Sequence, residues 1–129
     1  MGKQTLTDRL SQLHASAVHD VLCQIGCDDF VLPNTIKPIE SSQKLAGKIF
    51  TIEGEITTSH TPHYTLIEWT SLLSSIPQDY VGVCQPNTTE VALMGELSAE
   101  TLQKRGVIGY LVDGGCRDVS IIKELNFSV

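Results

Sequence analysis

The fold of this chain is decided near its end, by the stretch Gly106-Val107-Ile108-Gly109-Tyr110-Leu111-Val112-Asp113-Gly114-Gly115-Cys116-Arg117-Asp118. Residues 107–112 are a continuous apolar run of strand length. The next three residues, Asp113-Gly114-Gly115, are typical of a turn. An adjacent cation and carboxylate, Arg117 and Asp118, follow that turn. The stretch therefore predicts a strand with chemically useful side chains just beyond its carboxyl end.

Residues before this strand complete a parallel unit. Residues 80–84 form another short apolar strand, and residues 95–105 have a helical pattern that stops at Gly106. A strand, a helix and a second strand in this order make a βαβ unit, which is expected to be right-handed with its strands in a parallel sheet. The predicted fold class is therefore α/β.

The rest of the chain extends this alternation. Thr61 supplies a helix cap, and Pro62 takes the first helical position. The helical stretch beginning at Thr7 and the helix over 16–25 are expected to form an N-terminal helical layer. The further predicted elements are a helical stretch beginning at Thr7, a helix over 16–25 ended by Gly26, a strand within 45–56, a helix over 62–75 and a final helix beginning at Asp118 or Ser120.

Composition limits the class of protein. A chain of 129 residues, 41% apolar and 19% charged, is expected to form one globular domain. Nine Lys and Arg against 15 Asp and Glu give 9 − 15 = −6, without a basic block, so direct binding to nucleic acid or to anionic lipid is disfavoured. No membrane-spanning stretch or signal-peptide core is present, so a cytoplasmic location is expected. The four cysteines fit no disulfide framework and are interpreted as free, half-buried thiols.

Two segments carry the chemistry, Met94-Gly95-Glu96-Leu97-Ser98 and Arg117-Asp118, with twenty residues between Glu96 and Arg117. Both follow strands of the βαβ unit, and ligands of α/β sheets gather beyond the carboxyl ends of the strands. The first N–H groups of a helix beginning at Gly95 can hold a carboxylate, and Arg117 can clamp the same anion. Asp118 offers the hard oxygen that Mg²⁺ prefers. The combination predicts an oxyanion bound beside a divalent metal.

In these segments and others, the chain resembles the RraA-like family. Its members include divalent-metal-dependent 4-hydroxy-4-methyl-2-oxoglutarate/4-carboxy-4-hydroxy-2-oxoadipate aldolases and the regulator of RNase E activity A. The likeness covers nearly the whole chain and is most specific in its last segment. The segments that carry it are Ser16-Ala17-Val18-His19-Asp20-Val21-Leu22, Leu45-Ala46-Gly47-Lys48-Ile49-Phe50-Thr51, Met94-Gly95-Glu96-Leu97-Ser98 and Gly106 to Asp118.

The resemblance implies an α/β fold of the swivelling β/β/α type, assembled as a trimer or hexamer. It implies retro-aldol cleavage of a 4-hydroxy-2-oxo acid to pyruvate and a second oxo acid, with possible oxaloacetate decarboxylation. The implied cofactor is a divalent cation, Mg²⁺ or Mn²⁺. Arg117 and Asp118 are implied to be catalytic, with Asp118 as the metal ligand. The residues implied to bind the pyruvyl part of the substrate are Gly95, Glu96, Leu97, Ser98 and Arg117.

The chain departs from the family in length. Beyond Val129 the family normally continues through strands that complete the sheet and contribute to a neighbouring subunit's site. Residues 1–129 are therefore expected to form a single RraA-like domain that lacks its C-terminal strands. Two alternatives to the aldolase stay open, a protein-binding regulator of a ribonuclease and an inactive fragment of the family. The Arg-Asp pair favours the aldolase, because a surface that only binds protein has no need of a metal carboxylate.

Three other side chains are candidate functional groups. His60 and His63, spaced H-x-x-H, are interpreted as exposed loop histidines, because no third protein ligand accompanies them. Cys116 lies beside Arg117, a cation that would activate the thiol if it were exposed, but no base is positioned to complete a nucleophile.

Overall fold

The computed structural model describes residues 4–129, which divide into two compact units at the boundary between Lys37 and Pro38. The first unit holds two helices, α1 (Leu6–Ser11) and α2 (Ala15–Gln24). A capping box begins α1, because the Thr5 hydroxyl accepts from the Asp8 N–H and the Asp8 carboxylate accepts from the Thr5 N–H. Both predicted N-terminal helices are therefore present.

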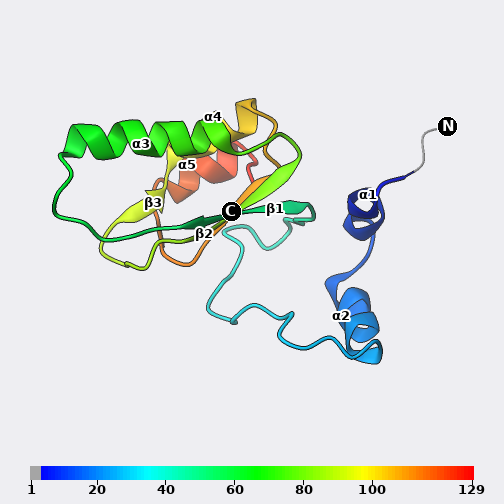
Figure 1. Ribbon diagram of the computed structural model, residues 1–129. Helices are drawn as coiled ribbons and strands as arrows, with labels where there is room; N and C mark the ends of the chain where they lie inside the picture. Colours follow the sequence, from blue (N-terminus) through cyan, green and yellow to red (C-terminus); the bar gives the residue numbers. More distant parts are fainter. Residues whose placement is uncertain (1–3) are drawn as a thin grey trace. The chain divides into compact units, whose positions relative to one another are not determined.

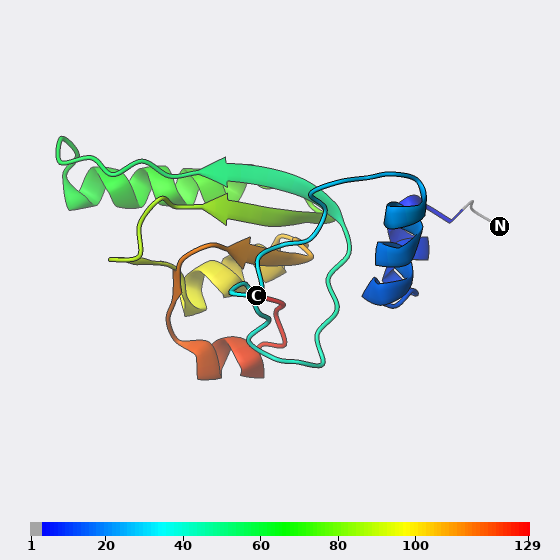
Figure 2. The same cartoon turned by 90° about the horizontal axis from the view of Figure 1, so that it is seen from below.

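The second unit is built on a three-stranded parallel sheet with the order β1-β2-β4. Figure 1 shows its three helices on one side of the sheet, and Figure 2 shows the strands side by side. The predicted α/β class and the βαβ unit are confirmed. The elements are β1 (Lys48–Glu53), α3 (Pro62–Ser75), β2 (Tyr80–Gln85), α4 (Glu96–Lys104), β4 (Gly109–Val112) and α5 (Val119–Glu124).

The core of the second unit joins the sheet to its helices. Tyr110 from β4, Leu102 from α4 and Ile122 from α5 are fully buried. Each fully buried aliphatic side chain contributes about 1.5–3 kcal/mol, so this cluster makes a firm base for the loops at the strand ends. The other buried members of the cluster are Ile52, Leu73, Ile76, Cys84, Met94, Ala99, Val107 and Phe127.

A second, two-stranded parallel sheet was not predicted. It consists of β3 (Ala92–Met94) and β5 (Gly115–Cys116). The prediction of a turn through Gly115 was therefore wrong at that residue. Strands of three and two residues are too short to produce a periodic pattern. Their pairing matters for the site, because it fixes the residues after β3 next to the residues after β5.

Most predicted boundaries are close to the observed ones. The helix predicted over 62–75 is α3, with the Thr61 hydroxyl accepting from the Tyr64 N–H at 3.3 Å. The strand predicted within 45–56 covers 48–53, and the strand predicted over 107–112 was too long, because β4 covers only 109–112. The final helix begins at Val119, between the two predicted starts.

The four cysteines are free, as predicted. Cys116 is half-buried as predicted, but Cys84 is fully buried and Cys23 and Cys27 are exposed, so the prediction of half-buried thiols was wrong for these three. Within residues 4–129, every helix is too short or too polar to span a bilayer.

Candidate active site

One pocket of about 620 Å³ is lined by the segments that follow all three strands of the main sheet. His60 comes from the loop after β1, Gly95 from the segment after β2, and Asp118 from the segment after β4. In α/β proteins these carboxyl-end segments are the usual place for a ligand. The structure brings all six sequence-predicted site residues into this pocket, namely Gly95, Glu96, Leu97, Ser98, Arg117 and Asp118.

The N-terminus of α4 forms one wall of the pocket. Gly95 is the N-cap residue and has no side chain to cap the helix. The first N–H groups of any helix lack acceptors within the helix and carry the positive end of its dipole. The Glu96 N–H donates to Asp118 Oδ2 at 3.2 Å, which leaves the next two, on Leu97 and Ser98, as donors for a ligand. This wall is therefore suited to an anion.

Gly95 also permits a close approach of the two halves of the motif. A Cβ at this position would lie 3.0 Å from Asp118 Oδ2 and 3.1 Å from both Cγ and Nε of Arg117. These distances are tighter than ordinary contacts, so any larger residue would push the Arg117 and Asp118 side chains away from the helix. The glycine relieves this crowding and is not required by its backbone, which is extended with φ −161°.

Asp118 has an unusual place in the chain. It is the N-cap residue of α5 in the left-handed conformation, with φ 57° and ψ 32°. An N-cap aspartate normally accepts from its own helix, but Asp118 makes no such bond. Its carboxylate instead accepts from the Glu96 N–H of α4 and lies 3.5 Å from Arg117 Nε. A carboxylate has about four lone pairs, so these contacts leave capacity for a cation.

The position of Arg117 is set by its backbone. Its N–H donates to the Met94 carbonyl oxygen at 2.9 Å, which continues the pairing of β3 with β5. The side chain is 73% exposed and lies over Gly95. An exposed guanidinium beside a helix N-terminus can turn toward a bound carboxylate without losing buried contacts.

Sequence reasoning missed Trp69 and the place of His60 at the pocket, although His60 is an exposed loop histidine as predicted, whereas His63 was wrongly placed in the loop. Trp69, on α3, lines the pocket and donates from Nε1 to Ser98 Oγ at 3.1 Å, which ties α3 to the first turn of α4. His60 lines the pocket too, although His63 lies on α3 and does not. The H-x-x-H spacing alone does not separate the two residues, but the predicted helix start at Pro62 already placed His63 on the helix and His60 before it.

The donor set at the pocket fits a hard divalent cation held by one carboxylate. In the described part of the chain, no three His, Cys, Asp or Glu side chains gather closely enough to hold a metal together. A structural zinc site takes four protein ligands and a catalytic one takes three, so neither type fits here. Mg²⁺ is usually held by one or two carboxylates with water and substrate oxygens in the other positions. Asp118, facing the pocket, meets that requirement.

Cys116 is unsuited to act as a nucleophile. Burial, and then the negative charge of Asp118, raise the pKa of its thiol. The Sγ atom lies 3.6 Å from the Arg117 carbonyl oxygen, to which it donates. A thiol held neutral in this way is the opposite of one activated by a neighbouring cation.

Comparison with known proteins decides the family. The RraA-like family, described as aldolase/RraA, matches residues 15–129. The chain belongs to the RraA-like family. This RraA-like chain is also 36% identical over 111 residues to an uncharacterized protein of Methanocaldococcus jannaschii. That match covers 84% of the chain and 49% of the relative, so the chain spans about half of the relative's length.

Solved structures show the same fold. A crystal structure described as novel cellulases from microbes associated with the gut ecosystem is 24% identical, with a TM-score of 0.81 over 100% of this chain and 60% of that one. The RNA-processing inhibitor RraA from Thermus thermophilus is 18% identical, with a TM-score of 0.68 over 91% of this chain and 65% of that one. The RraA-like family thus includes both aldolases and regulators of RNA processing.

Proposed function

We propose that this protein is a divalent-metal-dependent lyase that cleaves a 4-hydroxy-2-oxo acid to pyruvate and a second oxo acid. The observation that carries the proposal is the meeting of a helix N-terminus, a guanidinium and a carboxylate, those of α4, Arg117 and Asp118, in one pocket. A 2-oxo acid has a carboxylate next to a carbonyl oxygen, and these groups match an anion site beside a metal ligand. Membership of a family that includes aldolases supports the same class of reaction.

The substrate carboxylate is assigned to the first turn of α4. The N–H groups of Leu97 and Ser98 can donate to it, and Arg117 can add a charged hydrogen bond. Glu96 has a smaller part, because its N–H is already bonded to Asp118 and its carboxylate would repel an anion. Trp69 lies on the neighbouring wall of the pocket and would border the bound acid.

The chemical step requires stabilisation of the negative charge that develops on the enolate. When the bond between C3 and C4 breaks, the electron pair becomes the enolate of pyruvate, whose charge scarcely exists in the intact substrate. Arg117 and the α4 dipole are positioned to interact with that charge and therefore favour the transition state over the ground state. Mg²⁺ or Mn²⁺ bound at Asp118 would supply Lewis-acid polarisation of the 2-oxo group.

The same enolate arises when oxaloacetate loses CO₂. A site that stabilises the enolate for cleavage must also stabilise it for decarboxylation. A secondary oxaloacetate decarboxylase activity therefore belongs to the proposal, and it reports on the enolate site alone.

Assembly is a further part of the proposal. We expect one RraA-like domain over residues 1–129 and a homotrimer or homohexamer in which another subunit borders the pocket. Leu97, at the pocket, is 73% exposed, and Ile49, on the outer strand β1, is 62% exposed. Exposed apolar side chains at these places are suited to cover by a second subunit.

The experiment that tests this function is an assay of pyruvate release from 4-hydroxy-4-methyl-2-oxoglutarate by the full-length protein. We expect release with Mg²⁺ or Mn²⁺, its loss on addition of EDTA, and its return with excess metal. Oxaloacetate should be decarboxylated under the same conditions. An absence of pyruvate from both substrates at saturating metal would refute the lyase.

A further inference from the structure

We propose that His60 is a catalytic residue, the general base that removes the proton of the substrate's 4-hydroxyl group. This inference rests on the proposed lyase function and assigns a step that Arg117 and Asp118 do not perform. Arg117 is a permanent cation, and Asp118 is assigned to the metal. The pocket therefore needs a separate acceptor for the hydroxyl proton.

The fold places His60 where such a base is needed. It stands in the loop after β1, and the segments after β2 and β4 carry the anion site and Arg117. All three segments line the same pocket, so a substrate held at α4 also borders the β1 loop. Among the residues that line this pocket, the one histidine is His60. Histidine is the side chain most often used to exchange protons near neutral pH.

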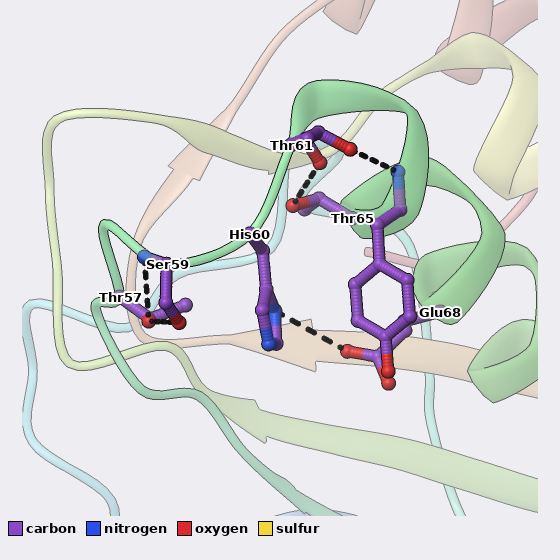
Figure 3. A network of polar contacts seen from close by, with 7 residues as sticks. Thr57, Ser59, His60, Thr61, Thr65 and Glu68 are labelled. Atoms are coloured by element: carbon purple, nitrogen blue, oxygen red, sulfur yellow. Dashed lines mark hydrogen bonds and ion pairs between the residues drawn. The ribbon is translucent and has the colours of Figure 1, made fainter.

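Glu68 faces the His60 ring from the first turns of α3. His60 Nδ1 lies 3.7 Å from Glu68 Oε2. Figure 3 marks this contact with a dashed line. The distance is longer than a normal hydrogen bond, but contacts of catalytic dyads are often long before substrate binds. A carboxylate at Nδ1 favours the proton on that nitrogen and leaves Nε2 as the basic atom. Glu68 is therefore a positioning residue for His60.

Tyr64 contacts both His60 and Glu68. Its ring meets the His60 ring edge to face, with centroids 4.5 Å apart. A hydrogen bond between the Tyr64 hydroxyl and the Glu68 carboxylate raises the pKa of the phenol, as does the negative charge of that carboxylate. The Thr61 hydroxyl caps α3 just after His60, which fixes the point at which the loop enters the helix. The His60 ring, the Glu68 carboxylate and the end of the loop at Thr61 are thus held close together.

The proposed step balances without another reactant. Nε2 of His60 takes the 4-hydroxyl proton, the C4–O bond becomes a carbonyl, and the C3–C4 bond breaks with its electron pair moving into the enolate of pyruvate. The imidazolium then returns the proton to C3, which gives the methyl group of pyruvate. Decarboxylation of oxaloacetate reaches the same enolate with no hydroxyl proton to remove, and this enolate takes its proton from water, so the reaction does not need this base.

This difference gives a sharp experiment. Variants His60→Gln and His60→Ala are compared with the unchanged protein for pyruvate release from 4-hydroxy-4-methyl-2-oxoglutarate and from oxaloacetate, both at saturating Mg²⁺. We expect cleavage to fall by about 10²–10⁴-fold, the usual contribution of a general base. Decarboxylation should stay within about threefold of the unchanged protein, and free imidazole should restore part of the cleavage activity of His60→Ala. Glu68→Gln should lower cleavage alone, by a smaller factor.

His63→Gln is the matched control, because it removes a second exposed histidine from the same segment without touching the pocket. It should leave both activities unchanged. An equal fall of both activities in His60→Gln would overturn the base and make His60 a structural residue, and an unchanged cleavage rate would overturn it as well. If the unchanged protein acts on neither substrate, the lyase itself fails, which is a separate result.

Discussion

Replacing Arg117 by alanine is expected to lower pyruvate release from 4-hydroxy-4-methyl-2-oxoglutarate by about 10²–10³-fold, the usual cost of one donor aimed at a developing oxyanion. Oxaloacetate decarboxylation should fall by a similar factor, because both reactions form the same enolate. The side chain is 73% exposed and the core lies elsewhere, so the thermal unfolding midpoint should change little. Steady-state rates at saturating Mg²⁺, with a melting curve of each variant, measure both effects.

Lys104→Ala is the matched control for this variant. It removes one positive charge from the last turn of α4, at a side chain that is 73% exposed and paired with Glu100. The change in net charge is the same, but the pocket is untouched. A loss of activity as large in Lys104→Ala as in Arg117→Ala would mean that overall charge, and not the local guanidinium, is responsible.

Replacing Asp118 by asparagine is expected to weaken binding of the divalent metal. Asparagine tolerates the left-handed conformation and can still accept from the Glu96 N–H, so the backbone of the site should be kept. The substitution removes only the charge on which the cation depends. Loss of a partner behind a metal ligand costs about 10–100-fold in affinity, and loss of the ligand itself should raise the half-saturating Mg²⁺ concentration by more than about 100-fold. Activity measured against Mg²⁺ concentration gives this value.

Asp113→Asn is the control for Asp118→Asn, since Asp113 is an exposed aspartate of the same segment outside the pocket. It should keep the original Mg²⁺ requirement. A normal Mg²⁺ curve for Asp118→Asn would show that the carboxylate serves only to join α5 to α4, which would remove it as the metal ligand.

The elements that sequence predicted well are those with a strong local cause. Thr61 and Pro62 define the start of α3, and Gly106, with φ +77°, defines the stop after α4. The apolar run before Asp113 is long enough to identify a strand. The β3–β5 pair escaped prediction because strands of three and two residues are too short to repeat the two-residue period of a strand. Its existence depends on contacts between residues more than 20 positions apart.

The site residues also divide into those with a local sequence signal and those that depend on distant contacts. Gly95, Arg117 and Asp118 were found because the carboxyl-end rule applies to any strand that is correctly predicted. That Asp118 accepts from α4 and not from its own helix could not be foreseen, because it depends on the register between β3 and β5. His60 was interpreted only as an exposed loop residue, because its contact with Glu68, two turns along a helix, forms only once α3 has formed.

The central claim is that one pocket joins an anion site to a metal site, and Trp69 allows the most direct measurement of it. The chain has one tryptophan, and it lines that pocket. Oxalate resembles the enolate of pyruvate, so its titration can be followed by Trp69 fluorescence with Mg²⁺ and with EDTA. We predict a saturable change with Mg²⁺ and a much weaker one, or none, with EDTA. No response to oxalate at millimolar concentration in the presence of Mg²⁺, or an equal response in EDTA, would contradict the claim.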